Sequence, residues 1–490
     1  MSTVSRFHLQ ALQPANLSTQ PEYEPSMPDG GDTTQIDVNA PFAGLEFHSI
    51  YIVACTFIVF FILPGVALLY SGLTRRKSAM TFLFQALLIL AVTTFQWIFW
   101  GYSLTYSRNG GPFIGTLRNF GLMEVMAAPS PGSAVLPEIL FVMFQLLFGA
   151  CTVMIVAGGA FERGNILALL IFSFFWETIV YCPLARWTWS SQGWLYNLPS
   201  IDFAGGGPVH IASGCASLAY AVVLGKRRGY PDASMRRPHN TTLVFIGTIF
   251  IWTGWLGFNG GSTLSASVRG YLAIMNTNVA ASTGILGWVL VDMIRNKGKF
   301  SVVGACEGAI AGLVGITPAA GCVTVWLGAL IGFLTGIVCS LCKNLNDWIR
   351  VDEGMDVFKL HGVGGMVGSF LTGIFADHYI SALDGGTLIP GAINGEGVQV
   401  GKQLAEICAV SAYSFVVTAV LLMIMKYIPF LGLRVSEEAE MVGLDASFFV
   451  DEQIGDFSLL ERINASPLMG VSKAPSSEVQ TAEGTEIKSA

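Results

Sequence analysis

The chain has 490 residues, with a hydrophobic share of 52%, a charged share of 12% and a formal net charge of −7. Soluble domains carry roughly 25% charged residues, so this composition excludes a string of ordinary soluble domains. The sequence contains no phosphate-binding loop or dinucleotide-binding motif. We therefore expect neither ATP-driven transport nor a cofactor, and no nucleic-acid partner.

Residues 1–45 form a polar tail rich in proline and acidic residues. It has no apolar stretch that would serve as a cleaved signal peptide. Asn16 begins the sequence Asn-Leu-Ser, which makes it a candidate glycosylation site if this tail lies outside the cell.

Residues 46–430 form the predicted transmembrane domain, because apolar runs of roughly 20 residues recur along it. We expect an all-α polytopic membrane protein with about eleven transmembrane helices. The predicted segments are 46–72, 80–105, 135–159, 165–185, 206–225, 240–258, 275–294, 301–317, 320–342, 357–376 and 402–430.

Basic residues are concentrated in alternate loops, which predicts the orientation. One set of loops carries Arg75, Arg76, Lys77, Arg163, Lys226, Arg227, Arg228, Arg236, Arg237, Arg295, Lys297, Lys299, Lys343, Arg350, Lys426 and Arg434. The other set has little more than Arg108, Arg118, Arg186 and Arg269. By the positive-inside rule the N-terminus lies outside and the C-terminus in the cytosol, and we expect the plasma membrane as the location.

Residues 431–490 form the predicted cytosolic tail. Its first part, GLRVSEEAEMVGLDASFF, is acidic, and we expect it to be ordered against the cytosolic face. From about residue 465 the tail reads as disordered.

Two histidines, His210 and His361, lie inside the fifth and tenth apolar segments, each among glycines. A titratable side chain at membrane depth marks a substrate or proton path by default, whereas the structural alternative is an imidazole bonded to a neighbouring carbonyl. Because the two occupy matched positions five segments apart, we favour a pair that lines a pore between two inverted repeats of five helices, followed by a final helix.

Asp202 precedes the first histidine by eight residues, at the start of its helix. Its carboxylate is suited to capping the free amides of residues 203–205. Its charge would also draw a cation toward the pore or take part directly in deprotonation, and the sequence leaves these roles open.

Aromatic residues mark the outer halves of three segments. Phe144 and Phe148 are one helical turn apart and share a face. Such rings, together with a hydroxyl, suit a small cation through cation–π contact, although packing is the alternative role. The other aromatic residues are Trp189, Trp255 and Phe258, and the hydroxyl is that of Ser262.

Asp352, Glu353 and Asp356 precede the second histidine. Carboxylates at a helix start are favoured by the helix dipole, and the sequence offers no partners for a metal site there. The nine cysteines lack metal-ligand spacing, and we interpret them as packing residues.

Four motifs in order, DFAGGGPVHIASG, GWLGFNGGS, NTNVAASTG and DVF followed by HGVGGMVG, resemble signatures of the Amt/Mep/Rh ammonium transporter family. The resemblance covers about residues 45–445. It is strongest to fungal ammonium permeases, on the evidence of the RRPHN segment, the long N-terminal tail and the extended C-terminus. It implies a homotrimer in which each subunit has its own pore. Because some fungal members replace the first histidine with glutamate, His210 also implies the twin-histidine subgroup linked to nitrogen sensing.

The resemblance also implies roles for the matching residues. Phe144, Trp189 and Ser262 would form an external recruitment site with Asp202 near its entrance; Phe148, Phe258 and Trp255 would form a gate, and His210 and His361 would line the pore. Trp187 remains an alternative to Trp189. The tail residues Glu437, Glu438, Glu440, Gly443, Leu444 and Asp445 would form a regulatory segment on the cytosolic loops. Ser458 and Ser466 are candidate phosphorylation sites for a cytosolic kinase.

A physical argument supports deprotonation during transport. NH₄⁺ and K⁺ are similar in size, and moving either bare cation through an apolar channel has a large desolvation cost. Only ammonium is able to lose a proton and cross as a neutral molecule. We expect NH₄⁺ to be recruited outside, deprotonated near Asp202, passed as NH₃ along the histidines and reprotonated inside. Whether the proton follows is left open.

Two other functions compete with ammonium transport, which is not an enzymatic activity. The first is a nitrogen-sensing receptor on the same fold, which mutants uncoupling uptake from signalling would reveal. The second is a different secondary transporter, which would predict broken helices or further carboxylates within the membrane. We see neither feature in the sequence.

Overall fold

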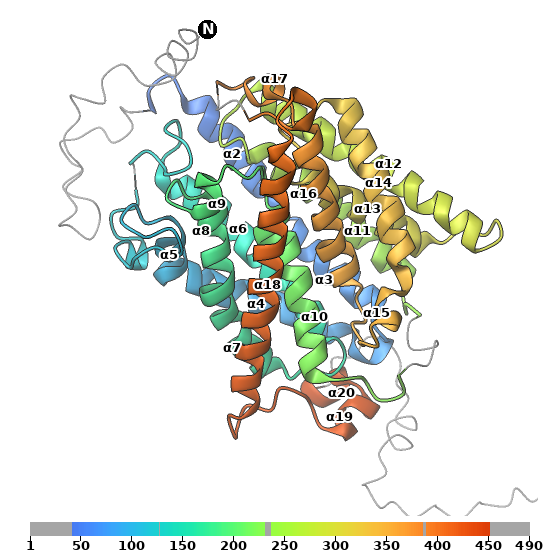
Figure 1. Ribbon diagram of the computed structural model, residues 1–490. Helices are drawn as coiled ribbons and strands as arrows, with labels where there is room; N and C mark the ends of the chain where they lie inside the picture. Colours follow the sequence, from blue (N-terminus) through green and yellow to red (C-terminus); the bar gives the residue numbers. More distant parts are fainter. Residues whose placement is uncertain (1–41, 127, 231–236, 386–388, 451–490) are drawn as a thin grey trace, which may run out of the picture.

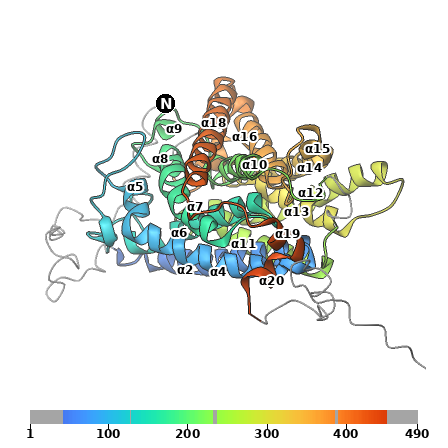
Figure 2. The same ribbon diagram turned by 90° about the horizontal axis from the view of Figure 1, so that it is seen from below.

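The computed structural model describes residues 42–126, 128–230, 237–385 and 389–450. These residues form helices and no β-strand, with only two isolated β-bridges. The long helices lie side by side in one bundle (Figure 1), with α17 (His378–Ser381) at one end. At the other end, which we call the tail end, α19 (Glu437–Val442) and α20 (Leu444–Phe448) lie across the bundle (Figure 2).

The first half of the chain supplies ten α-helices or helix segments and several 3₁₀ and π turns, labelled η. They are α2 (Glu46–Val59), α3 (Ile62–Leu73), η3 (Arg76–Ser78), α4 (Ala79–Gln96), η4 (Trp97–Gly101), α5 (Tyr102–Tyr106), η5 (Phe120–Leu122), α6 (Glu138–Val156), η6 (Ala157–Ala160), α7 (Ile166–Trp176), η7 (Glu177–Tyr181), α8 (Cys182–Trp189), α9 (Trp194–Asn197), η8 (Gly206–Ile211), α10 (Ala212–Leu224) and α11 (Thr241–Gly261).

The second half continues with α12 (Val268–Arg295), α13 (Val302–Ile316), α14 (Val325–Leu341), η10 (Cys342–Asn344), α15 (Leu345–Trp348), η11 (Phe358–Val363), α16 (Gly364–Phe375), η12 (Ala392–Asn394) and α18 (Val398–Lys426). The long α18 packs against both α10 and α16.

Nine helices in the described residues are long and apolar enough to cross a membrane. They coincide with nine of the predicted segments. The remaining two predicted segments coincide with α13, which is a shorter apolar helix, and with η11 followed by α16. The predicted all-α polytopic class is therefore confirmed.

The predicted segment 275–294 begins earlier than expected, at Val268. Hydropathy missed this first part because it contains polar residues such as Arg269. The guanidinium of Arg269 donates hydrogen bonds to the carbonyl of Gly321 and to the carboxylate of Asp384. A charged residue is tolerated in the first turn because it is paired there.

Both histidines of the predicted pair lie in π-helical turns. His210 belongs to η8 and His361 to η11. π turns are rare and occur frequently at functional sites, because the inserted residue redirects side chains. The two helices approach closely at Gly214, where a Cβ atom would lie 2.2 Å from the backbone nitrogen of Gly362. This contact brings the two histidine-bearing turns together.

The outer surface of the bundle is apolar along the spanning helices. Exposed side chains there include Ile50, Leu87, Leu286 and Ile294. A soluble protein rarely exposes large apolar patches, so these side chains fit contact with lipid. The buried polar groups described below face the interior instead.

Candidate functional site

The site is centred on the two histidine rings, which are in direct contact. The Nδ1 atoms of His210 and His361 are 3.4 Å apart, and the ring centroids are 5.4 Å apart. Both rings are buried, with His210 1% and His361 8% exposed. Among the described residues the two rings bond to each other, and neither ring bonds to a neighbouring carbonyl. In this contact one neutral ring donates and the other accepts.

A stack of aromatic rings adjoins the histidines on one side. The rings of Phe148 and Phe258 are stacked with centroids 3.8 Å apart and an interplanar angle of 19°. Phe144 lies one turn along α6, with its centroid 5.0 Å from that of Phe148. The centroid of His210 is 6.4 Å from that of Phe258. The rings that the sequence marked on separate segments therefore converge.

Trp255 lies beside the histidines. Its ring stacks on His210 with a centroid distance of 5.1 Å, and its indole nitrogen donates to the hydroxyl of Thr317 at 2.8 Å. The centroid of Trp255 is 5.8 Å from that of Phe258. The residue that we predicted as part of a gate thus connects Phe258 to the histidine pair.

Geometry distinguishes Trp189 from Trp187. The ring of Trp189 meets Phe148 edge-on at 5.9 Å, and its indole nitrogen donates to the carbonyl of Asp202 at 3.2 Å. Trp187 instead donates to the carbonyl of Phe113 and packs on Trp194, away from the aromatic stack. Of the two, Trp189 is the tryptophan that contacts Phe148 and Asp202.

Ser262 and Phe144 lie at the end of the aromatic stack away from the histidines. The Ser262 hydroxyl donates to the carbonyl of Phe258 at 2.8 Å, directly after the end of α11. The preceding Gly261 lies against the Phe144 ring, which a Cβ atom would meet at 2.7 Å. Ser262 and Trp189 are partly exposed, whereas Phe144 is fully buried. Ser262 and Trp189 are thus the members of this group nearest to solvent.

Asp202 caps the turn that carries the first histidine. Its Oδ1 accepts hydrogen bonds from the amides of Gly205 at 2.8 Å and Gly206 at 2.6 Å, and its Oδ2 accepts from Gly207 at 2.8 Å. The predicted capping role is confirmed, but we placed it too early. The capped amides are those of residues 205–207, so Gly205 was predicted correctly, whereas the amide of Phe203 donates to the carbonyl of Pro318.

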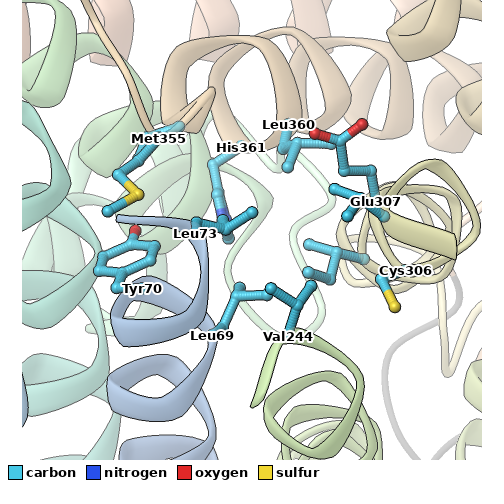
Figure 3. A pocket seen from close by; sticks show the side chains of 12 residues that line it. Leu69, Tyr70, Leu73, Val244, Cys306, Glu307, Met355, Leu360 and His361 are labelled. Carbon is cyan, nitrogen blue, oxygen red and sulfur yellow. The ribbon is translucent and has the colours of Figure 1, made fainter. Parts of the chain in front are cut away.

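A small cavity adjoins the histidine pair on the side away from Phe258. His361 points into it, among Leu69, Tyr70 and Leu73 (Figure 3). The cavity offers about 20 Å³ for the centre of a water-sized molecule, enough for about one such molecule. The hydroxyl of Tyr70 donates to the carbonyl of Ile155 at 3.1 Å, which holds its ring at this wall.

The acidic residues before His361 divide into three different contacts. Asp352 forms a two-pronged ion pair with Arg227, with a shortest distance of 2.8 Å. Burial opposes ionisation of Asp352, but the hydrogen bonds and charge of Arg227 outweigh it and hold its pKa below the usual value. Glu353 accepts a hydrogen bond from the amide of Phe358 at the helix start. Asp356 pairs with Lys359 at 2.7 Å. Glu353 thus bonds to an amide of the helix start, whereas Asp352 and Asp356 pair with basic side chains.

The first part of the tail is ordered against the loops at the tail end. Glu440 pairs with Arg434 at 2.7 Å and accepts from the amide of Arg228 at 2.6 Å. Asp445 accepts from the amides of Met80 and Thr81. The remaining contacts of the predicted tail residues join Glu437 to Arg228, Leu444 to Ser78 and Gly443 to the neighbourhood of Lys77, while Glu438 is exposed.

Three predictions lie outside the described residues. They are the glycosylation site at Asn16, the polar tail up to residue 41, and the disordered end of the chain with Ser458 and Ser466. Within the described ranges, no group of three or more His, Cys, Asp or Glu side chains has an arrangement that would hold a metal ion.

Three carboxyl groups inside the helices were not predicted: those of Glu177 and Glu406 are buried, and that of Glu307 is partly buried. Glu177 in η7, Glu307 in α13 and Glu406 in α18 stand within predicted apolar segments. Our statement that further intramembrane carboxylates were not evident is therefore wrong. These residues could have been found in the sequence, because a glutamate inside an apolar run is as costly at membrane depth as the two histidines.

Comparison with known proteins identifies the family. The model of the Ammonium Transporter Family matches residues 50–453. Ammonium transporter 1 of Schizosaccharomyces pombe is 48% identical over 423 residues, which cover 86% of this chain and 84% of that protein. Ammonium transporter MEP2 of Saccharomyces cerevisiae is 46% identical over 443 residues, which cover 88% and 87% of the two chains.

Solved structures agree with this assignment. The crystal structure of Candida albicans Mep2 matches with a TM-score of 0.81 at 44% identity, covering 91% of this chain and 96% of that one. A structure described as a sensor Amt protein matches with a TM-score of 0.75 at 26% identity, covering 83% and 99%. The predicted resemblance to fungal ammonium permeases is confirmed. The chain belongs to the ammonium transporter family.

Proposed function

We propose that this ammonium transporter recruits NH₄⁺ at Trp189, Phe144 and Ser262, deprotonates it near Asp202, and passes NH₃ between the histidines. One observation carries the proposal. The Phe148–Phe258 stack, the His210–His361 pair and the small cavity follow one another in continuous contact. This order supports a path with an aromatic gate above a narrow pore.

The chemistry of the path favours a neutral molecule. The aromatic stack and the cavity wall are apolar, so an unpaired cation would lose its hydration there without compensation. The histidine pair offers one donor and one acceptor in place of water. K⁺ has no neutral form, and this difference supplies selectivity without a size filter.

The recruitment site is suited to NH₄⁺, the charged form of the substrate. Aromatic faces attract small cations through cation–π contact. Asp202 adjoins Trp189, because the indole nitrogen of Trp189 donates to the backbone carbonyl of Asp202. Phe148 and Phe258 then separate this site from the histidines. We propose Trp255 as the wall that joins gate and pore.

The arrangement in the cell follows from the loop charges. We propose a plasma-membrane protein with residues 1–45 outside, residues 46–430 as the transmembrane domain in two inverted five-helix repeats plus a final helix, and residues 431–490 in the cytosol. We also propose a homotrimer with one pore in each subunit, contacts with the lipid bilayer, and a cytosolic kinase or signalling partner for the tail.

A nitrogen-sensing role is the second candidate. The ordered tail residues bind segments 75–81 and 224–228. These segments include the start of α4 and the end of α10, so the tail is in direct contact with helices of the bundle. The match to a sensor Amt protein is consistent with such a role. Variants of the tail that separate uptake from signalling test it.

The experiment for the transport proposal compares two tryptophans. We expect Trp189→Leu to raise the ammonium concentration for half-maximal uptake by about tenfold, because about 1–2 kcal/mol of cation–π attraction is lost. Trp187→Leu is the matched control, since Trp187 packs outside the aromatic stack. Uptake in cells that lack other ammonium transporters, scaled to protein at the surface, is the measurement. Equal behaviour of the two variants would contradict the recruitment site.

A further inference from the structure

A line of buried polar side chains follows one face of α18. Gln399, Gln403 and Glu406 are 2%, 0% and 0% exposed, and their spacing of four and three residues places them on one side of the helix. The side-chain nitrogen of Gln399 donates to Gln403 Oε1 at 3.2 Å, and the side-chain nitrogen of Gln403 donates to Glu406 Oε2 at 3.4 Å. Such groups are costly at membrane depth, so they call for a function.

The first two members hold the backbone that leads to Asp202. Gln403 accepts from the amide of Ile201 at 2.6 Å and donates to the carbonyl of the same residue at 2.8 Å. Gln399 donates to the carbonyl of Pro199 at 3.0 Å. The segment before the histidine turn is thus fastened to α18 by side chains that satisfy its backbone groups.

The third member meets Asp202 itself. The carboxyl groups of Glu406 and Asp202 are neighbours on the two sides of one glycine and interact with each other. Both converge on Gly207, where a Cβ atom would lie 2.6 Å from Glu406 Oε1 and 3.3 Å from Asp202 Oδ2. Two adjacent buried carboxyl groups do not both ionise, so a proton is retained between them.

The surrounding hydrogen bonds identify which carboxyl group keeps the proton. Three backbone amides point at the oxygens of Asp202, and such donors favour its ionised form. Oε1 of Glu406 is buried and has no hydrogen-bond partner among the described residues when it is treated as an acceptor. A proton on Glu406 makes this group a donor and gives it a partner in Asp202.

We infer that Glu406 is a neutral positioning residue. Its carboxyl O–H donates a hydrogen bond to the Asp202 carboxylate and holds that carboxylate in place for ammonium. The inference rests on the role of Asp202 in the proposed function. Glu406 neither takes a proton from the substrate nor adds a second negative charge. The Asp202 carboxylate then has four donors and one orientation, with its charge available to the entering cation.

Two substitutions separate a neutral donor from an ionised or proton-carrying group. Glu406→Gln keeps a donor of similar shape, and Glu406→Leu removes it. We expect Glu406→Gln to stay within about twofold of the native concentration for half-maximal uptake, and Glu406→Leu to raise it by about tenfold, the loss of one charge-assisted hydrogen bond. Thr418→Val on the same helix is the control, since Thr418 bonds only to Trp176 in the described residues.

Uptake per surface molecule decides between the outcomes. Native behaviour of Glu406→Leu would overturn the positioning role. An equal defect in both variants would overturn the neutral donor, because the amide replaces a donor but not a carboxylate or a proton carrier. Asp202→Asn is measured in parallel. Unchanged uptake in that variant would refute the proposed role of Asp202, irrespective of Glu406.

A spectroscopic measurement covers the case in which Glu406→Leu does not reach the membrane. The infrared carbonyl band of a protonated carboxylic acid is recorded at neutral pH for the purified native protein and for Glu406→Gln. We expect this band to be weaker in Glu406→Gln than in the native protein, so that the native-minus-variant difference spectrum contains it. An unchanged band would show that Glu406 is ionised in the native protein and would overturn the inference.

Discussion

At the scale of single residues, the contact between the histidines depends on a glycine. At Gly214 the backbone of α10 meets that of η11, and a methyl group would lie 2.2 Å from the nitrogen of Gly362. Because backbone atoms cannot yield as a flexible side chain does, a larger residue must separate the two helices. The distance between His210 and His361 would grow with that separation.

We therefore expect Gly214→Ala to destabilise the protein by about 1–3 kcal/mol, as overpacking does, and to lower uptake. Melting of the purified protein and uptake per surface molecule are the two measurements. Gly401→Ala is the control, because nothing lies within 4 Å of a Cβ atom there. A Gly214→Ala protein that melts and transports as the control does would contradict the close contact.

A second residue-scale prediction concerns pH. Burial, and then the charge of Asp356, raise the pKa of Glu353 to about 7. A carboxyl group with a raised pKa in the folded state contributes stability in its protonated form, and this contribution is lost as pH rises from the ordinary value of 4.5 to about 7. The loss amounts to at most about 3 kcal/mol.

We expect the melting temperature of the native protein to fall between about pH 5 and about pH 8, and Glu353→Gln to flatten that fall. The exposed Glu396→Gln serves as the control. Identical pH profiles for native protein and Glu353→Gln would show that Glu353 does not retain its proton in the fold.

Residue patterns predicted some of this site but not its assembly. The turn spacing of Phe144 and Phe148 predicted that they share a face, and the structure places their rings 5.0 Å apart. The stacking of Phe148 on Phe258 joins α6 to α11, and no local pattern encodes such a contact. The capping by Asp202 was predicted with a shift, because the backbone before a π turn is irregular.

At the scale of elements, the tail helices α19 and α20 are held by a few ionic contacts. Glu440 is the central one, since it joins Arg434 in the tail to the amide of Arg228 in the loop after α10. Removing its carboxylate leaves partly buried donors without their partner, which costs at most about 1–3 kcal/mol. The tail would then open more often from the loops it covers.

We expect Glu440→Ala to increase amide hydrogen exchange in residues 436–448 and in segments 75–81 and 224–228. Glu438→Ala is the control, because Glu438 is exposed in the same helix. Faster exchange in both variants would mean that helix stability, and not the contact of Glu440, holds the tail. No change in either would contradict the role of Glu440.

Hydropathy predicted the elements themselves well, since every apolar segment contains a helix. It did not predict the π turns η8 and η11, whose inserted residue changes the direction of a side chain without changing composition. It also passed over Glu406, because one acidic residue hardly lowers the mean of a long apolar window. Hydropathy therefore missed the features that depend on a single residue, because it averages over a window of residues.

At the scale of the whole molecule, the helices from both halves of the chain meet at one path. Phe148, Asp202 and His210 come from the chain up to the end of the fifth predicted segment, and Phe258, His361 and the α18 side chains that fix Asp202 come from the chain after it. The path therefore exists only in the folded bundle. In the proposed function, a cation is held outside this path and a neutral molecule passes through it.

The most direct test replaces both histidines. The native protein and a His210→Leu/His361→Leu variant are reconstituted in vesicles, and ammonium-evoked current and ammonium uptake are measured together, with K⁺ as the comparison ion. We predict that the native protein responds to ammonium and not to K⁺, and that the variant loses the ammonium-selective current. An unchanged ammonium-selective current in the variant would contradict a pore built on the histidine pair.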